Sequence, residues 1–354
     1  MLISALASVN SQTNQLGLSA KRSVCVLLVD GLGYSNLSDA GGHASFINSS
    51  NIEKINCFFP ATTSTSLTSL ATGESPTETR FIGYQVFDKE FLVPRNLLSG
   101  WSDYQAGADF QTLPTVSEQA IEQGIEFHVV SLPEYESSGL TGATMRAATF
   151  HGEHDIANRF AVAANLLGDA TPKIVFLYVP ELDQIAHEWG CQSDKWLGGL
   201  EILDSLVRNF VVTLPSKVGL VITADHGVID IPAGSHIYLD EVLPKETFAF
   251  VGGDTRGLFL YLEDKMQTGL VLEQLRIRYQ GDCWVLTPDN LVGSGYWDNL
   301  SKVTSVLPDI ILLARKKVAL YHRGFAKKKS LLMVGHHGSI SSEELSVPLL
   351  RYNF

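Results

Sequence analysis

Three short runs of apolar and β-branched residues limit what this chain can fold into. They are Val24 to Val29 (VCVLLV), Ile174 to Val179 (IVFLYV) and Val218 to Thr223 (VGLVIT). Runs of about four to eight such residues are typical of strands buried on both faces, as in a parallel sheet covered by helices. Glu126 to Ser131 is a fourth candidate strand. The chain therefore predicts a central, mostly parallel sheet.

Helical patterns separate these runs, at Ser117 to Glu122, His154 to Leu167 and Asp194 to Val212. Strands that alternate with helices favour an α/β class, with a doubly wound, mostly parallel sheet flanked by helices. After Asp230 the pattern changes to two strands joined by a glycine-containing turn, which predicts a hairpin, and then a helix. These last elements are expected at 247–251, 257–263 and 264–279.

The change of pattern also predicts how the chain is divided. We expect residues 1–231 and 336–354 to form the α/β core, with residues 232–335 inserted as a smaller α+β segment.

The composition excludes several classes of protein. The 354 residues are 45% hydrophobic and 18% charged, which argues against a disordered chain. The net charge of −12 repels a phosphate backbone, so we expect no nucleic acid duplex as partner. No apolar run approaches the length of a membrane span, and the start of the chain lacks the pattern of a secretory signal. These features predict a cytoplasmic protein and leave its oligomeric state open.

Acidic residues and histidines follow each of the three core runs. They are Asp30, then Asp183 with His187, then Asp225 with His226. Each alone is compatible with a turn, a helix cap or a helix-face pair. The carboxyl ends of parallel strands share one edge of a sheet, however, so these side chains should converge. Carboxylates in one cleft repel one another unless a cation neutralises them, and their mixture with imidazoles suits zinc first, then manganese or iron.

Two further features belong with this cluster. The pair His336 and His337 precedes Gly338 near the end of the chain and offers another imidazole ligand. The hydroxyl-rich segment 59–73 (FPATTSTSLTSLATG) predicts a capped helix that ends at Gly73. A helix N-terminus binds phosphate, and a metal-bound hydroxyl placed there is an activated nucleophile. The combination indicates phosphoryl transfer, whereas the GxSxG and GxxxxGK[ST] motifs are absent.

Five pieces of this sequence, in this order, resemble the alkaline phosphatase superfamily and, within it, the nucleotide pyrophosphatase/phosphodiesterase branch. The pieces are LLVDGLG, FPATTSTSLTSLATG, YVPELDQIAHEWG, ITADHG, and HHG followed by EELSVPLL. The resemblance extends from Asp30 to Leu350, over most of the chain.

The resemblance implies two divalent metal ions, with zinc as the first choice, and a threonine nucleophile. One ion would be held by Asp183, His187 and His337, the last preferred over His336 because the family's ligand directly precedes a glycine. The second would be held by Asp30, Asp225, His226 and the hydroxyl of Thr63. Thr63 would form a covalent intermediate that water cleaves, and the adjacent Thr62 is the alternative nucleophile.

The sequence departs from the family pattern at positions that bear on the substrate. Ser66 stands where an asparagine is usual, Arg80 follows Thr79 where a histidine and a glycine are frequent, and Ala186 replaces a glycine. We therefore expect Ser66 and Arg80 to contact the substrate, although Arg80 is equally compatible with a plain surface residue. The expected substrate is a small-molecule phosphodiester or nucleotide pyrophosphate. The alternatives are a phosphomonoesterase or phosphonate hydrolase on the same scaffold, and a non-catalytic metal-dependent binding protein.

Overall fold

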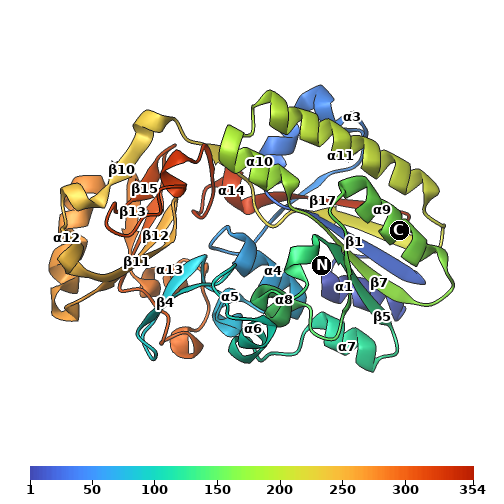
Figure 1. Ribbon diagram of the computed structural model, residues 1–354, viewed down its shortest axis with the longest axis horizontal. Helices are drawn as coiled ribbons and strands as arrows, with labels where there is room; N and C mark the ends of the chain where they lie inside the picture. The colour runs from blue at the N-terminus through green and yellow to red at the C-terminus, as the bar shows by residue number, and fades with distance from the viewer.

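A seven-stranded sheet forms the centre of the computed structural model, which describes residues 1–354 (Figure 1). The strand order is β2-β17-β8-β1-β7-β5-β6, and only β17 runs antiparallel to its neighbours. The strands are β1 (Ser23–Val29), β2 (Glu53–Asn56), β5 (Glu126–Ser131), β6 (Thr149–Gly152), β7 (Lys173–Val179), β8 (Val218–Thr223) and β17 (Ser346–Tyr352). The predicted α/β fold with a mostly parallel sheet is confirmed.

The three apolar runs form the middle of this sheet, as expected. Every residue of β1, β7 and β8 is buried, because helices cover both faces. The register places Leu27 beside Leu177 on one side and Ile222 on the other. Alternate side chains of β1 then point into two separate apolar clusters, one on each face of the sheet.

Helices α1, α4 and α7 contribute to the cluster on one face, whereas α3, α9 and α11 contribute to the cluster on the other (Figure 1). Local signals explain where several begin: Thr115 and Glu118 form a capping box at α7, and the Ser193 hydroxyl accepts a hydrogen bond from the backbone of Trp196 at α11. The helices are α1 (Leu2–Val9), α2 (Tyr34–Asp39), α3 (Ser45–Asn48), α4 (Thr63–Thr72), α5 (Pro76–Thr79), α6 (Tyr104–Phe110), α7 (Val116–Glu122), α8 (Gly139–Thr144), α9 (Ile156–Gly168), α10 (Glu181–Trp189), α11 (Asp194–Thr213), α12 (Thr268–Tyr279), α13 (Pro288–Gly293) and α14 (Ser342–Leu345).

A second, antiparallel sheet of four strands lies beside the first, on the left of Figure 1. Its order is β11 (Phe248–Asp254), β12 (Gly257–Leu262), β14 (Ile310–Ala314) and β13 (Cys283–Leu286). The predicted hairpin is confirmed as β11–β12, and the predicted helix begins slightly later, as α12. One face of this sheet, through Phe259 and Ile311, joins an apolar cluster of the central sheet, and the other packs on α12. The proposed division at residues 232 and 335 stays a prediction.

Three two-stranded sheets complete the fold. They pair β3 (Gln85–Asp88) with β4 (Val93–Asn96), β9 (Ile229–Asp230) with β16 (Gly335–His336), and β10 (His236–Tyr238) with β15 (Ala319–Tyr321). The four cysteines are unpaired, in agreement with a fold that does not depend on disulfides. None of the helices combines the length and the apolar character of a membrane span.

A buried ion pair joins the second sheet to the C-terminal segment. The Arg256 guanidinium donates to both carboxylate oxygens of Glu344 at 2.9 Å, and the two side chains are 1% and 0% exposed. Glu344 also accepts the backbone N–H of Ser339, directly after the turn that carries His337 and Gly338. The pair therefore holds the tail against the second sheet.

We expect Glu344→Gln to lower the free energy of unfolding by about 3–5 kcal/mol, because it leaves the Arg256 charge buried without its partner. Urea denaturation measures this loss. The control is Glu53→Gln, which breaks the exposed pair of Glu53 with Arg351 and should cost no more than about 1 kcal/mol. Equal losses in the two variants would contradict a special role for the buried pair.

Candidate active site

The loops after β1, β7 and β8 bring the predicted acidic residues and histidines together at one edge of the sheet. Asp30 directly follows β1, Asp183 and His187 lie one turn apart on α10, and Asp225 and His226 follow β8. His337 arrives from the loop after β16. All six side chains are buried except that of His187, which is partly exposed.

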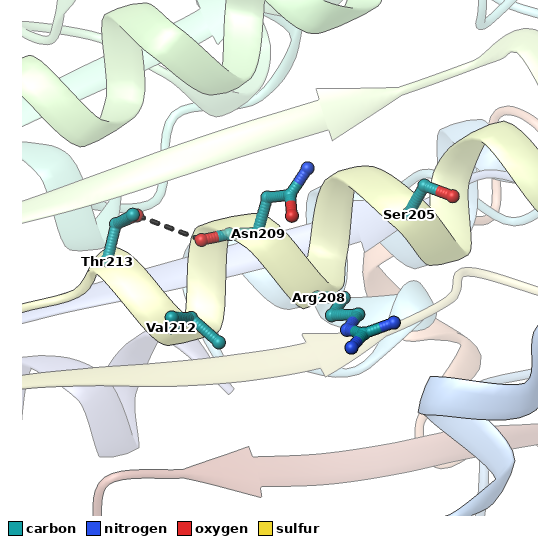
Figure 2. Close-up of a pocket in the computed structure, with 5 residues that line it drawn as sticks. All are labelled: Ser205, Arg208, Asn209, Val212 and Thr213. Carbon is teal, nitrogen blue, oxygen red and sulfur yellow. Dashed lines mark hydrogen bonds between the residues drawn. The ribbon is translucent and has the colours of Figure 1, made fainter.

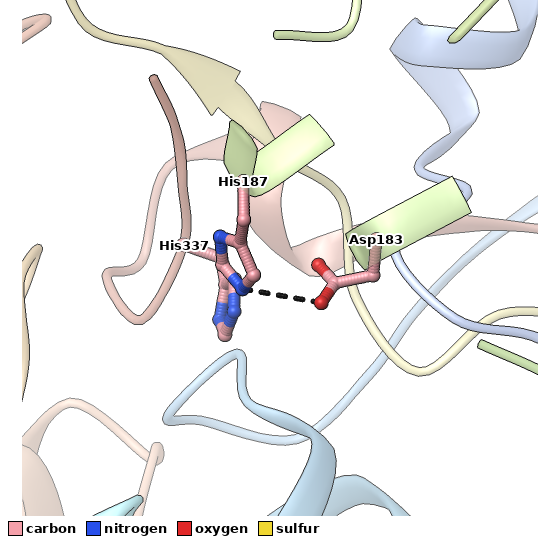
Figure 3. Close-up of side chains that lie close together, drawn as sticks. All are labelled: Asp183, His187 and His337. Atoms are coloured by element: carbon pink, nitrogen blue, oxygen red, sulfur yellow. Dashed lines mark ion pairs between the residues drawn. The ribbon is translucent and has the colours of Figure 1, made fainter. Parts of the chain in front are cut away.

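One group of side chains that could hold a metal ion consists of Asp183, His187 and His337 (Figure 3). Their ligand atoms lie within 4.8 Å of one another. The Nε2 atom of His187 is 3.1 Å from Oδ2 of Asp183, and the two imidazole centroids are 5.2 Å apart.

A second group contains Asp30, Asp183 and His226, again within 4.8 Å. The Oγ1 atom of Thr63 lies 3.2 Å from Nε2 of His226 and 3.5 Å from Oδ1 of Asp30. Asp225 stands beside this group, with Oδ2 at 3.6 Å from Nε2 of His226. Its other oxygen accepts the backbone N–H groups of Gly31 and His226, which fixes the carboxylate in place.

The three imidazoles share one orientation. The Nδ1 atoms of His187, His226 and His337 lie 2.9, 3.3 and 2.8 Å from backbone carbonyl oxygens. When Nδ1 donates to a carbonyl, Nε2 keeps its lone pair, and in His187 and His226 this atom lies 3.1 to 3.6 Å from carboxylate oxygens. This arrangement is typical of histidines that bind a metal.

The buried negative charge of the two groups and of Asp225 also favours a bound cation. Burial, and then the charges of Asp225 and Asp183, hold the pKa of Asp30 well above its usual value. Oδ1 of Asp183 and Oδ2 of Asp225 are buried and have no hydrogen-bond partner. Unpaired carboxylate oxygens in an apolar interior are costly, and a divalent ion would satisfy both the oxygens and the repulsion. The residues therefore fit a divalent metal.

The pKa of His187 also reflects the negative charge of the site. Burial lowers its pKa, but the Asp183 carboxylate outweighs burial and raises the pKa to about 9. A proton on His187 thus offsets part of the negative charge in the absence of a metal ion.

The hydroxyl-rich segment forms α4, which begins at Thr63 and ends at Thr72. Gly73 follows as the cap, and its φ of +78° is the left-handed conformation typical of that position. Thr62 precedes the helix. Its hydroxyl faces Oδ2 of Asp254, at 3.5 Å, and not the two groups of candidate metal ligands. The backbone N–H groups of the first turn of α4 have no partner within the helix, so they can receive an anion next to Thr63.

His336 lies outside both groups. Its Nδ1 is 2.8 Å from the Thr255 hydroxyl and its Nε2 is 3.1 Å from the Met333 carbonyl, so both ring nitrogens have partners. Burial lowers the pKa of His336 to about 3, and the ring is therefore neutral. His337, not His336, is the imidazole that the fold brings to the carboxylates.

The two predicted substrate contacts lie elsewhere. The Ser66 hydroxyl donates to the backbone carbonyl of Asp225 at 2.7 Å and so supports that loop. The Arg80 guanidinium lies over the ring of Phe110, 4.3 Å from its centroid, and contacts the Ser305 hydroxyl. The structure does not bring Ser66 or Arg80 to the cavity beside Thr63.

Two further residues, not expected from the sequence, contact the candidate metal ligands. The Tyr178 hydroxyl, at the end of β7, donates to Oδ2 of Asp30. Burial, and then the Asp30 charge, raise the pKa of Tyr178 well above its usual value, so it stays a donor. Asp254 comes from the second sheet, with Oδ2 at 3.7 Å from Nδ1 of His337. A tyrosine in an otherwise apolar strand was a signal for Tyr178, whereas Asp254 read as an ordinary turn residue.

A cavity of about 1300 Å³ opens onto these residues. Thr63, Asp183, His187 and His337 line its floor, and its walls carry aromatic side chains. These include Tyr84, Trp101, Tyr135, Phe176, Tyr178 and Tyr321. Another pocket, of about 540 Å³, lies on the outer side of α11 and contains no carboxylate or imidazole (Figure 2).

Two comparisons with known proteins give matches, one to a family and one to solved structures. The family model for type I phosphodiesterase/nucleotide pyrophosphatase matches residues 24–339. Human ectonucleotide pyrophosphatase/phosphodiesterase 5 has a similar structure, with a TM-score of 0.73 and 15% identity, over 93% of this chain and 87% of that chain. The murine protein gives 0.72 at 16% identity, and its inactive form in complex with AMP gives 0.73 at 16%, both with the same coverage. None of the curated proteins matches the chain by sequence.

The similar structures share the fold, and the family match covers every residue of both groups, from Asp30 to His337. Family and fold together indicate a hydrolase of phosphodiester or pyrophosphate bonds. The resemblance noted in the sequence is confirmed: this chain belongs to the type I phosphodiesterase/nucleotide pyrophosphatase family.

Proposed function

We propose that this protein hydrolyses small phosphodiesters or nucleotide pyrophosphates with two divalent ions, zinc as the first choice, and with Thr63 as nucleophile. One observation carries the proposal: the Thr63 hydroxyl lies at a helix N-terminus, 3.2 Å from Nε2 of His226 and 3.5 Å from Oδ1 of Asp30. The cavity that Thr63 lines is also lined by Asp30, Asp183, His187 and His337.

Asp183, His187 and His337 would hold one ion, and Asp30, Asp225, His226 and the Thr63 hydroxyl the other. When bound, such a pair of ions supplies the positive charge that stabilises the attacking and leaving oxygens of an in-line displacement. The unpartnered oxygens of Asp183 and Asp225 support this assignment.

The chain's own residues prepare the attack. The Thr63 hydroxyl donates toward Asp30, and its oxygen keeps a lone pair for phosphorus. As the bond from Oγ1 to phosphorus forms, the hydroxyl proton leaves by way of Asp30 and solvent, the bond from phosphorus to the leaving oxygen breaks, and that oxygen departs with a proton. The first-turn N–H groups of α4 receive a phosphate oxygen. Water then cleaves the phosphorus–Oγ1 bond and regenerates Thr63. Tyr178 holds Asp30 throughout, because its hydroxyl occupies Oδ2 and leaves Oδ1 toward Thr63.

The cavity supports a diester in preference to a monoester. A monoester carries close to two negative charges at neutral pH, and enzymes that prefer it usually place extra cations on its oxygens. No arginine lines this cavity, Arg80 is stacked on Phe110, and the two lysines among the lining residues, Lys327 and Lys329, are exposed to solvent. The aromatic walls suit a planar substituent such as a nucleobase. The murine neighbour in complex with AMP supports a nucleotide substrate.

Replacement of the nucleophile tests the core of the proposal. Thr63→Ala should lower kcat at least ~100-fold with the fold and metal content unchanged, because covalent catalysis is lost and electrostatic stabilisation remains. Thr62→Ala is the matched control and should cost much less, since its hydroxyl faces Asp254. The reverse ranking would make Thr62 the nucleophile, and unchanged activity in both would point to direct attack by water.

Removal of the metal tests the cofactor and the class of substrate together. Chelation should abolish hydrolysis of a nitrophenyl phosphodiester, and zinc should restore it, with two ions per chain by elemental analysis. The restored enzyme should prefer the diester over the matched nitrophenyl monoester in kcat/KM. Active protein without a transition metal would contradict the cofactor. Two bound ions without any hydrolysis would favour a non-catalytic binding protein.

Tyr178→Phe tests how Asp30 is held. The ring and its packing on Phe176 remain, but the hydrogen bond to Asp30 is lost. We expect zinc affinity, measured by calorimetry, and kcat/KM to fall about 10- to 100-fold, the usual effect of losing a partner of a metal ligand. Tyr135→Phe removes a hydroxyl from the same cavity without touching Asp30 and should change neither value more than about twofold. Similar effects from both variants would remove Tyr178 from this role.

A further inference from the structure

Asp254 is a carboxylate that the proposed chemistry does not use. It is the last residue of β11 and extends from the second sheet into the cavity that Thr62 and Thr63 line. The approach is close because the neighbouring segment has a glycine: Gly338 has a φ of +116°, and a Cβ there would lie 2.6 Å from Cβ of Asp254. The hairpin thus meets the turn that carries His337.

Local contacts hold the Asp254 carboxylate but do not neutralise it. Oδ1 accepts the backbone N–H of Thr255 at 2.7 Å, and Oδ2 accepts the Thr62 hydroxyl at 3.5 Å. The only basic group within ion-pair distance is His337, at 3.7 Å, whose Nδ1 faces the carbonyl of Ala61. No lysine or arginine pairs with Asp254, and its side chain is 11% exposed.

The charge acts across the cavity. After burial, it contributes to the raised pKa values of Tyr84 and Tyr321, two tyrosines of the cavity wall. The hydroxyl that donates to it, on Thr62, belongs to the residue before the proposed nucleophile. Any phosphate that reaches Thr63 therefore binds in the field of Asp254.

We propose that Asp254 determines specificity by selecting phosphate esters with one negative charge over those with two. The inference rests on the proposed function and adds a residue that sets its substrate class. A diester carries one charge at neutral pH, whereas a monoester carries close to two, and a fixed, mostly buried carboxylate at the cavity opposes the second charge. Hydrolysis of a diester by water yields a monoester and an alcohol, so the same repulsion favours release of the monoester product.

The test compares matched nitrophenyl esters on metal-loaded enzyme. Asp254→Asn removes the charge and keeps the shape and the acceptor for Thr255. The ratio of kcat/KM for the diester to that for the monoester should fall about tenfold, mainly through a faster monoester reaction. Glu134→Gln removes an exposed charge from the same cavity wall and should leave the ratio within about twofold.

A binding measurement separates this inference from the proposed reaction. In Thr63→Ala protein, calorimetry would compare phenylphosphonate, a dianion above its second pKa, with its monoanionic monomethyl ester. Asp254→Asn should lower the Kd of the dianion about tenfold and leave the Kd of the monoanion unchanged. If wild type hydrolyses neither ester, the proposed function fails while this comparison still decides the role of Asp254.

An unchanged ratio and unchanged dianion binding would overturn the inference. Equal losses of kcat/KM for both substrates, together with a lower metal content, would also overturn it. Asp254 would then act by positioning His337. Asp254→Ser, which also removes the charge and keeps an acceptor, provides the same comparison if the asparagine variant folds poorly.

Discussion

Repulsion among buried carboxylates is the constraint around which this structure is arranged. Asp30 and Asp183 offer oxygens within 4.8 Å of each other, and Asp225 is completely buried beside them. Such a group is unstable without positive charge, as the raised pKa of Asp30 indicates. This constraint explains three features of the site together. The imidazoles and the unpartnered oxygens are suited to bind cations, and the helix N-terminus at Thr63 is suited to bind an anionic substrate.

The scaffold meets this constraint through backbone geometry. Parallel strands β1, β7 and β8 deliver the carboxylates to one edge, since the ends of parallel strands coincide. Gly31 has a φ of +71°, and a Cβ added to it would lie only 2.9 Å from Cβ of Asp183. The close approach of Asp183 therefore depends on glycine at this position. Backbone carbonyls orient the histidines, and the buried pair of Arg256 with Glu344 holds the turn after His337. The rigidity of the edge therefore comes from elements far apart in the sequence.

The second sheet contributes to the site as well as to the fold. Its apolar face shares a cluster with the central sheet, which fixes β11 and β12 relative to α4. That placement puts Asp254 against Thr62 and His337. The central sheet thus supplies the groups suited to the reaction, and the second sheet supplies a charge and a wall suited to discrimination among substrates.

Local sequence determined the central strands, the helix that starts at Thr63, and the positions of the acidic residues after the strands. Burial on both faces demands continuous apolar runs, and parallel topology then decides where their ends meet. Strand β17 was less visible, because Pro348 disfavours a strand. In the structure Pro348 lies opposite Lys54 of β2, beyond the part of β17 that pairs with β8.

Only the tertiary structure decided the partners of individual polar side chains. Ser66 supports the Asp225 loop, Arg80 stacks on Phe110, Tyr178 donates to Asp30, and Asp254 lies beside Thr62 and His337. Each of these contacts joins segments that are distant along the chain. Their geometry depends on how two sheets pack, and neither the period nor the spacing of residues in one segment encodes that packing.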